Sequence, residues 1–147
     1  MEETFILVKP DGVQRNLGYT IETYFRSKGF TLVEKHTVTP SLQLAQQHYE
    51  EHAGKPFYET ITHHLSSGPV LLMIWSGENA IALGRQTAMN IRQQFKIPGS
   101  PSHENVIHSS DAFESAQREI KLWRPLMFEA KLKEATMEFE TKIAQNM

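Results

Sequence analysis

His108 lies between a short apolar pair and the expected start of a helix, a position suited to phosphate chemistry. Residues 106–107 predict a very short strand, and residues 112–123 predict a helix with apolar positions at helical spacing. Asp111 followed by Glu114 matches the pattern of a capping box at its start. Because a helix N-terminus carries unpaired N–H groups and partial positive charge, we expect His108 to face an anion, with phosphate the obvious candidate.

Glu119 on that helix is the expected partner of His108. It shares a face with the first helical turn, and helical side chains lean toward the N-terminus. A carboxylate there would fix the imidazole and hold a proton on one ring nitrogen while the other stays free to attack. Taken alone, the two residues would more often be a structural histidine and a solvated helix charge, and it is the neighbouring residues that favour a functional pair.

Lys9 and two arginines are further candidates for binding an anion. Lys9 ends a buried apolar strand, where a ligand contact and a solvated strand end are both ordinary. Arg85 and Arg92 are seven residues apart in one predicted helix, hence on one face and about 10 Å apart along its axis. They could clamp a polyphosphate or simply be solvated.

Two histidine pairs carry no predicted function. His48 and His52 have the i,i+4 spacing of metal ligands, but no third ligand is evident nearby, so a structural role is favoured. His63 and His64 are adjacent on a helix and point in different directions.

The composition indicates an ordinary globular protein. The chain has 147 residues, 15 basic and 17 acidic side chains for a net charge of −2, and no cysteine. This near balance gives no general signal for nucleic acid or membrane binding, and cysteine chemistry is excluded. No apolar run approaches the length of a bilayer. We expect a single soluble domain over residues 1–147, located in the cytoplasm.

Apolar runs and turn residues predict alternating strands and helices. Lys9-Pro10-Asp11-Gly12 is typical of a turn. The expected strands span 4–8, 30–38, 70–75 and 106–107, and the expected helices about 21–28, 41–53, 56–65, 78–95 and 112–123. This order predicts an α+β fold, a ferredoxin-like βαββαβ sandwich with a four-stranded antiparallel sheet and covering helices.

Residues 124–147 predict a C-terminal helical extension. Pro125 is expected to start it, and its apolar residues fall on one stripe: Phe128, Leu132, Ala135, Phe139 and Ile143. Such an amphipathic helix should dock on its own domain or on a partner. Polar residues dilute the stripe, which argues against a membrane role.

Several motifs, in order and mostly at matching spacing from about Thr4 to Trp123, resemble the nucleoside diphosphate kinase family. So many specific motifs in one order make a chance match far less plausible than any single short pattern would. The motifs are Lys9-Pro10-Asp11-Gly12-Val13-Gln14-Arg15, Lys28-Gly29-Phe30, His48-Tyr49, Lys55-Pro56-Phe57, Ser67-Gly68-Pro69-Val70 and Asn105-Val106-Ile107-His108-Ser109-Ser110-Asp111.

The resemblance implies a ping-pong transfer of the γ-phosphoryl group between nucleotides through a phosphohistidine. His108 would be the nucleophile, supported by Glu119 and Ser110. The residues implied to gather around the phosphates are Lys9, Tyr49, Arg85 and Arg92.

The resemblance also implies how the nucleoside would be held. Lys9 and Asn105 would reach the ribose 3′-OH, and Phe57 would stack on the base. Stacking reads no base edge, so broad base specificity follows. Magnesium would arrive bound to the nucleotide phosphates, with no dedicated set of protein ligands.

The sequence departs from the family pattern between the two arginines. Only residues 86–91 separate them, where the family has a longer loop, and Thr87 lies in the wrong place to replace the family's phosphate-binding threonine. That loop normally makes trimer contacts in hexamers, so the resemblance predicts a homodimer. Tyr19 and Thr20 replace a family Gly-Glu pair, which bears on dimer packing.

Two other functions remain open at this level. One is a non-catalytic interaction domain that keeps the fold, which the shortened arginine region would favour. The other is a small-ligand or RNA-binding ferredoxin-like module, which would need exposed aromatic residues and a basic sheet face. The lysines and arginines show no such clustering.

Overall fold

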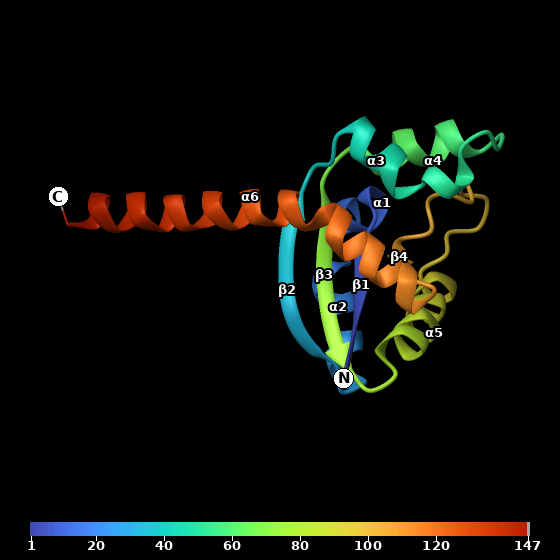
Figure 1. Cartoon of the computed structure of the whole chain (residues 1–147), viewed down its shortest axis with the longest axis horizontal. Helices are drawn as coiled ribbons and strands as arrows, with labels where there is room; N and C mark the ends of the chain where they lie inside the picture. The colour runs from blue at the N-terminus through green and yellow to red at the C-terminus, as the bar shows by residue number, and fades with distance from the viewer. Residues whose placement is uncertain (147) are drawn as a thin grey trace.

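The computed structural model describes residues 1–146 and contains one antiparallel sheet with helices on both faces (Figure 1). The strands are β1 (Glu2–Val8), β2 (Thr31–Val38), β3 (Val70–Gly77) and β4 (Ile107–Ser109). The helices are α1 (Pro10–Gln14), α2 (Gly18–Ser27), α3 (Leu42–His48), the 3-10 helix η1 (Glu50–His52), α4 (Tyr58–Leu65), α5 (Ala80–Gln94) and α6 (Phe113–Gln145).

The sheet has the strand order β2-β3-β1-β4, and every neighbouring pair is antiparallel. The central strand β1 is apolar on both faces because each face is covered: Phe5 and Leu7 point to one side, Ile6 and Val8 to the other. The predicted α+β fold, a ferredoxin-like four-stranded antiparallel sheet with covering helices, is confirmed.

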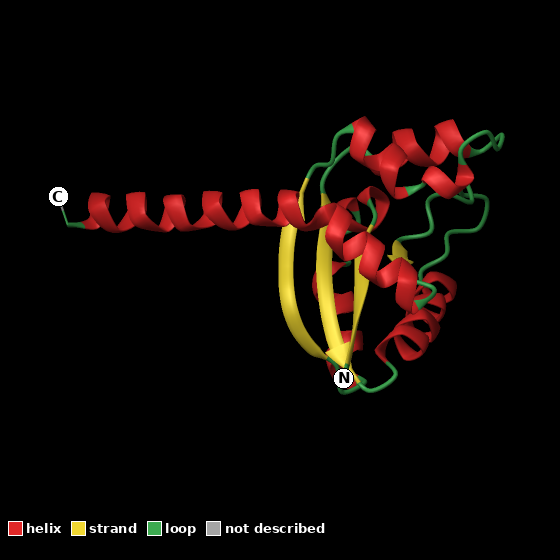
Figure 2. Ribbon diagram, viewed as in Figure 1, coloured by secondary structure: helices red, strands yellow, loops and turns green. Residues whose placement is uncertain are grey.

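Two apolar layers hold the helices against the sheet. On one face, α2 and α5 contribute Ile21, Phe25, Ala88 and Ile91 to a cluster with strand residues. On the other face, α6 crosses the strands and buries Trp123 (Figure 2). The register places Leu7 of β1 opposite His108 of β4, which brings the end of the first strand beside that histidine.

The segment after β1 is a short helix, not the predicted turn. Pro10 occupies the first helical position of α1, where its missing N–H costs no hydrogen bond. The Val13 amide donates to the Lys9 carbonyl at 3.0 Å. The turn residues therefore fold into one helical turn directly behind Lys9.

The predicted cap of α6 is also wrong in detail. The helix begins at Phe113 after Ala112, and no side chain caps it. The Asp111 carboxylate instead accepts a hydrogen bond from the Ser115 hydroxyl. Ser110 is not part of the helix end either, because its amide donates to the Phe5 carbonyl at 3.1 Å.

Pro125 does not start a new helix, because α6 is continuous through it. Trp123 and Met127 are buried on either side of the proline, so packing holds both turns on the sheet. Figure 1 shows that α6 changes direction in this region, as expected where a proline interrupts the hydrogen-bond ladder.

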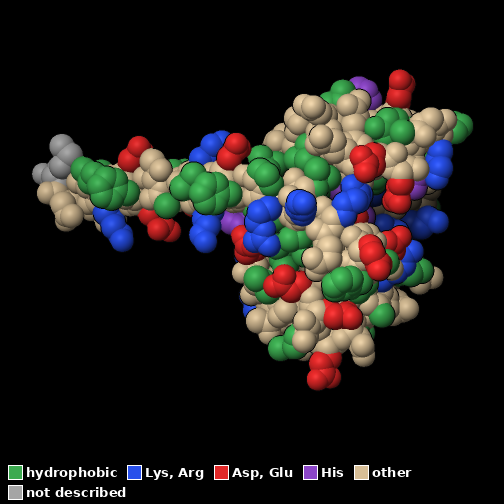
Figure 3. All heavy atoms as spheres, in the orientation of Figure 1, with side chains coloured by type: hydrophobic (Ala, Val, Ile, Leu, Met, Phe, Trp, Pro, Cys, Tyr) green, Lys and Arg blue, Asp and Glu red, His purple; other side chains and the backbone are tan. Residues whose placement is uncertain are grey.

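The last part of α6 projects away from the rest of the molecule (Figure 1 and Figure 3). Four residues of the predicted stripe are 46–64% exposed: Phe128, Leu132, Phe139 and Ile143. The stripe therefore does not dock on its own domain, and docking on a partner stays a prediction. Within residues 1–146, no helix combines the length and apolar character needed to cross a membrane.

Candidate functional site

A polar cavity of about 200 Å³ lies where the ends of β1 and β4 meet helices from both faces of the sheet. It collects residues that are far apart in the sequence. The lining residues are Lys9, His48, Tyr49, Glu51, His52, Arg85, Arg92, His108, Ser109, Asp111 and Glu119.

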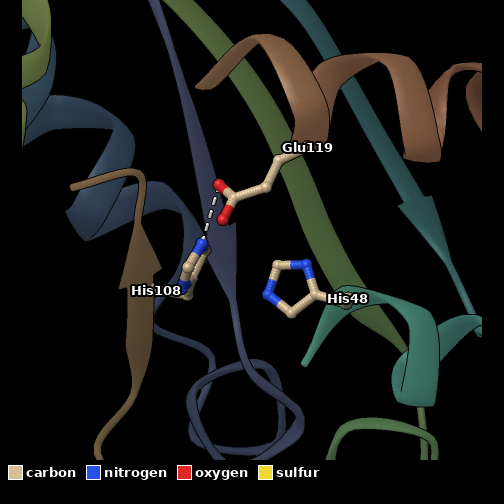
Figure 4. Close-up of side chains that lie close together, drawn as sticks. All are labelled: His48, His108 and Glu119. Carbon is tan, nitrogen blue, oxygen red and sulfur yellow. Dashed lines mark hydrogen bonds and ion pairs between the residues drawn. The ribbon is translucent and has the colours of Figure 1, made fainter. Parts of the chain in front are cut away.

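His108 and Glu119 form the hydrogen bond that the sequence predicts. His108 Nε2 lies 3.0 Å from Glu119 Oε1, and Ser110 Oγ donates to the same oxygen at 2.6 Å. A carboxylate can only accept, so Nε2 carries the proton and Nδ1 keeps its lone pair. Figure 4 shows Glu119 reaching from α6 to the ring of His108 on β4. The bonds fix both the orientation and the tautomer of the imidazole.

His48 belongs to this site, although the sequence favoured a structural role for it. Its ring lies edge-on to that of His108, with centroids 4.6 Å apart. Trp123 Nε1 donates to His48 Nδ1 at 3.1 Å, which fixes its tautomer. Burial, and then the nearby His108 and Arg118, hold the pKa of His48 well below its usual range. His48 thus forms an uncharged wall beside His108.

Lys9 is buried at the end of β1 and donates from Nζ to Asn105 Oδ1 at 2.7 Å. Burial, together with the charge of Arg92, lowers the pKa of Lys9 to about 8, although Asp11 acts in the opposite direction. Asn105 therefore touches the site through Lys9. It lies outside the residues that line the cavity.

Arg85 and Arg92 both project from α5 and line the cavity, as their spacing predicts. Arg92 Nε donates to the Ile107 carbonyl at 2.9 Å, which ties the helix to the histidine strand. Thr87 lies between them but faces the core, and its hydroxyl donates to the Leu83 carbonyl. It contributes nothing to the cavity.

Tyr49 supplies a hydroxyl to the same wall. Burial raises the pKa of its phenol well above the usual range, so it stays a neutral hydrogen-bonding group.

Phe57 does not line the cavity: it is 46% exposed, with its ring 5.3 Å from that of His52. Four further lining residues were not predicted as site residues from the sequence: Glu51, His52, Ser109 and Asp111. Ser109 and Asp111 belong to the motif around His108, so only their role was missed.

A strained turn sets the position of the histidine strand. Val106 has φ of 76°, an unusual conformation for a β-branched residue. The Ile107 amide donates to the Asn105 carbonyl at 2.9 Å, which makes this a γ-turn. Val106 is held from both sides, because its amide donates to Asp11 Oδ2 at 2.9 Å and its carbonyl accepts from the Lys9 amide at 2.8 Å.

The sheet order and its covering helices place the chain among ferredoxin-like α+β proteins. The family model for nucleoside diphosphate kinase matches residues 2–127. The chain belongs to the nucleoside diphosphate kinase family, and its relatives support an enzyme of that type.

The similarity extends over most of the chain and of its relatives. A nucleoside diphosphate kinase of Caldanaerobacter subterraneus is 44% identical over 132 residues, covering 85% of this chain and 95% of the relative. One from an Exiguobacterium species is 43% identical over 130 residues, covering 84% and 94%.

Solved structures agree with this assignment. The apo nucleoside diphosphate kinase of Encephalitozoon cuniculi superposes with a TM-score of 0.76 at 35% identity, covering 84% of this chain and 88% of that one. The enzyme of Halobacterium salinarum, solved in complex with CDP, gives a TM-score of 0.75 at 37% identity, covering 83% and 86%.

Proposed function

We propose that this nucleoside diphosphate kinase works by a ping-pong mechanism through a phosphohistidine on Nδ1 of His108. The observation that carries the proposal is the hydrogen bond between His108 Nε2 and Glu119, which leaves Nδ1 as the free nucleophile. Residues 1–147 would act as a single domain, with residues 124–147 as its helical extension.

In the first half-reaction, the Nδ1 lone pair attacks the γ-phosphorus of a nucleoside triphosphate. A P–N bond forms, the bond from the γ-phosphorus to the bridging oxygen breaks, and the diphosphate leaves with the electron pair. In the second, a β-phosphate oxygen of another diphosphate attacks the phosphorus, and the P–N bond breaks. The proton on Nε2 stays against Glu119 throughout, and Ser110 holds that carboxylate in place.

Positive charge supports the transfer. Phosphoryl transfer has a loose transition state with charge spread over the equatorial oxygens, so placed cations stabilise it. Lys9, Arg85 and Arg92 would supply this charge, and Tyr49 a neutral hydrogen bond. His48, kept uncharged by burial, adds no positive charge beside His108.

The nucleoside would lie toward Asn105 and Phe57. Lys9 and Asn105 already hydrogen-bond to each other, and a 3′-OH beside this pair would hydrogen-bond to both side chains. The exposed ring of Phe57 would stack on the base, which any base permits. We therefore expect broad base specificity, with nucleoside di- and triphosphates as substrates.

Magnesium would enter with the nucleotide. Mg²⁺ prefers oxygen ligands and keeps several waters, and the carboxylates that line the cavity without contacting His108 are Glu51 and Asp111. Both fit as partners to its water shell. When bound, the ion would neutralise phosphate charge as the transition state develops.

The test is to incubate the protein with γ-labelled ATP, then add GDP. We expect acid-labile, alkali-stable label on the chain, which moves into GTP. His108→Ala should abolish both, and His63→Ala, an exposed histidine outside the cavity, should leave both intact. Exchange that survives in His108→Ala would overturn the mechanism, and label that never leaves the chain would favour the non-catalytic alternative.

We also propose a homodimer, because α5 carries both arginines with only residues 86–91 between them and no separate loop. Light scattering should give the mass of two chains, and a hexamer would contradict the proposal. The cytoplasmic location expected from the sequence stays a prediction.

A further inference from the structure

A second group of metal-binding side chains lies outside the nucleotide cavity, between α4 and the loop that precedes β4. It consists of His64, His103 and Glu104, whose donor atoms all lie within 4.8 Å of one another. The rings of the two histidines have centroids 4.9 Å apart. We propose that these three residues bind a zinc ion, and this proposal does not depend on the phosphohistidine mechanism.

The donor set selects the class of ion. Two imidazoles and one carboxylate suit Zn²⁺, whereas Mg²⁺ and Ca²⁺ require oxygen ligands. In a tetrahedral site with bonds of about 2.0–2.1 Å, donors are about 3.3 Å apart. The donor atoms, now up to 4.8 Å apart, therefore have to move closer by an ångström or two at most, which side-chain rotations allow. Water would complete the fourth position.

Asp11 orients one of the proposed zinc ligands, His64, by a hydrogen bond. Its Oδ1 lies 2.9 Å from His64 Nε2, a bond in which the ring nitrogen donates to the carboxylate. Histidines that bind metal commonly donate their other ring N–H to a carboxylate, which fixes the ring and raises its basicity. In this arrangement Nδ1 of His64 is the nitrogen left with a lone pair for the ion.

The location gives the ion a structural consequence. His103 and Glu104 immediately precede Asn105, which accepts the hydrogen bond from Lys9. Asp11 holds His64 with one oxygen and the Val106 amide with the other. A bound ion would tie α4 to this loop and restrain the turn that leads into β4.

The decisive experiment is zinc titration of the untagged protein in competition with a chromogenic chelator. The group in the nucleotide cavity, His48 with His108 and Glu119, could also take zinc, so the titration is done in a His108→Ala background. We expect one equivalent of Zn²⁺ to bind. His103→Ala should weaken binding at least roughly tenfold, since one of three ligands is lost, and Glu104→Gln should also weaken it.

His63→Ala is the matched control, because His63 neighbours His64 on α4 and is not part of the cluster. It should leave zinc affinity unchanged. Circular dichroism melting without metal should be the same for all variants, which separates lost ligands from lost folding. In the His108→Ala protein, zinc should slow hydrogen exchange at the Val106 amide, and Co²⁺ should give the intense visible bands of a tetrahedral site.

Several outcomes would overturn the proposal. They are no zinc binding in the His108→Ala background, unchanged affinity in His103→Ala, or a loss of affinity in His63→Ala as large as in His103→Ala. Each can be distinguished from failure of the phosphohistidine mechanism, because none of these readouts uses nucleotide.

Discussion

At the scale of single residues, Glu119 connects the nucleophile to its support. One carboxylate oxygen accepts from both His108 and Ser110. Glu119→Gln keeps the shape but removes the charge that stabilises the ring as it is phosphorylated. We expect a fall of about 10²-fold in the rate of histidine phosphorylation, with nucleotide affinity nearly unchanged, measured by rapid-quench labelling.

Ser110→Ala is the graded comparison for that prediction. It removes one hydrogen bond to the carboxylate and leaves the charge, so its effect on the labelling rate should be smaller than that of Glu119→Gln. Equal rates in wild type and Glu119→Gln would show that the carboxylate only orients the ring.

The lowered pKa of Lys9 predicts that the activity of the free enzyme falls at alkaline pH. Burial, followed by the charge of Arg92, lowers its pKa to about 8. The ammonium is positive below that pH and loses its charge above it, so phosphate binding weakens as the pH rises. We expect kcat/KM, which reports the free enzyme, to fall on the alkaline side near pH 8. In Lys9→Arg the side chain stays charged, so any residual activity should lack this alkaline fall.

At the scale of elements, Asp11 of α1 holds the strained turn before β4. Asp11→Ala leaves the Val106 amide without its acceptor and frees His64. We expect a loss of about 1–3 kcal/mol in the free energy of unfolding, measured by urea denaturation. Asp11→Asn, which keeps one acceptor oxygen, should lose less.

The contribution of the Asp11 carboxylate to the free energy of unfolding depends on pH. Burial alone would raise the pKa of Asp11, but the His64 and Val106 hydrogen bonds outweigh burial and bring the pKa below the ordinary 3.8. A lowered pKa in the folded state means that the stabilisation is present above pH 3.8 and is lost as the pH falls through the folded value. The difference between wild type and Asp11→Ala should therefore shrink in acid.

The sequence predicted the elements with strong local patterns and missed those decided by packing. The apolar runs of β1 and β3 and the helical pattern of α5 were recognisable in the sequence. Pro125 was misleading, because burial of Trp123 and Met127 keeps α6 continuous against the local preference of proline.

The same division holds in the site. The pairing of His108 with Glu119 follows from one short segment and could be predicted from helical geometry. The approach of His48 to His108 joins residues sixty positions apart, and only the packing of α3 against α6 creates it. The sequence signals for His48 are the His48-Tyr49 motif and its position three residues after Ala45, on the buried side of α3.

At the scale of the whole molecule, α6 divides into a packed part and a projecting part. Met137, Phe139 and Ile143 are largely exposed, so deleting residues 136–147 should change the free energy of unfolding by no more than about 0.5 kcal/mol. Thermal and urea melts measure this. Met127→Ala, within the packed part, should cost about 2–5 kcal/mol, and a comparable loss on deletion would show that the projection is buried in solution.

The pairing of Leu7 with His108 also has a consequence during synthesis. The first strand leaves the ribosome long before its partner β4. About a hundred further residues must be translated before Lys9 can lie beside His108. A nascent chain halted before residue 107 lacks the nucleophile and one edge of its sheet. Competence for catalysis should therefore arise in a single late step, once α6 has emerged and closed over β1.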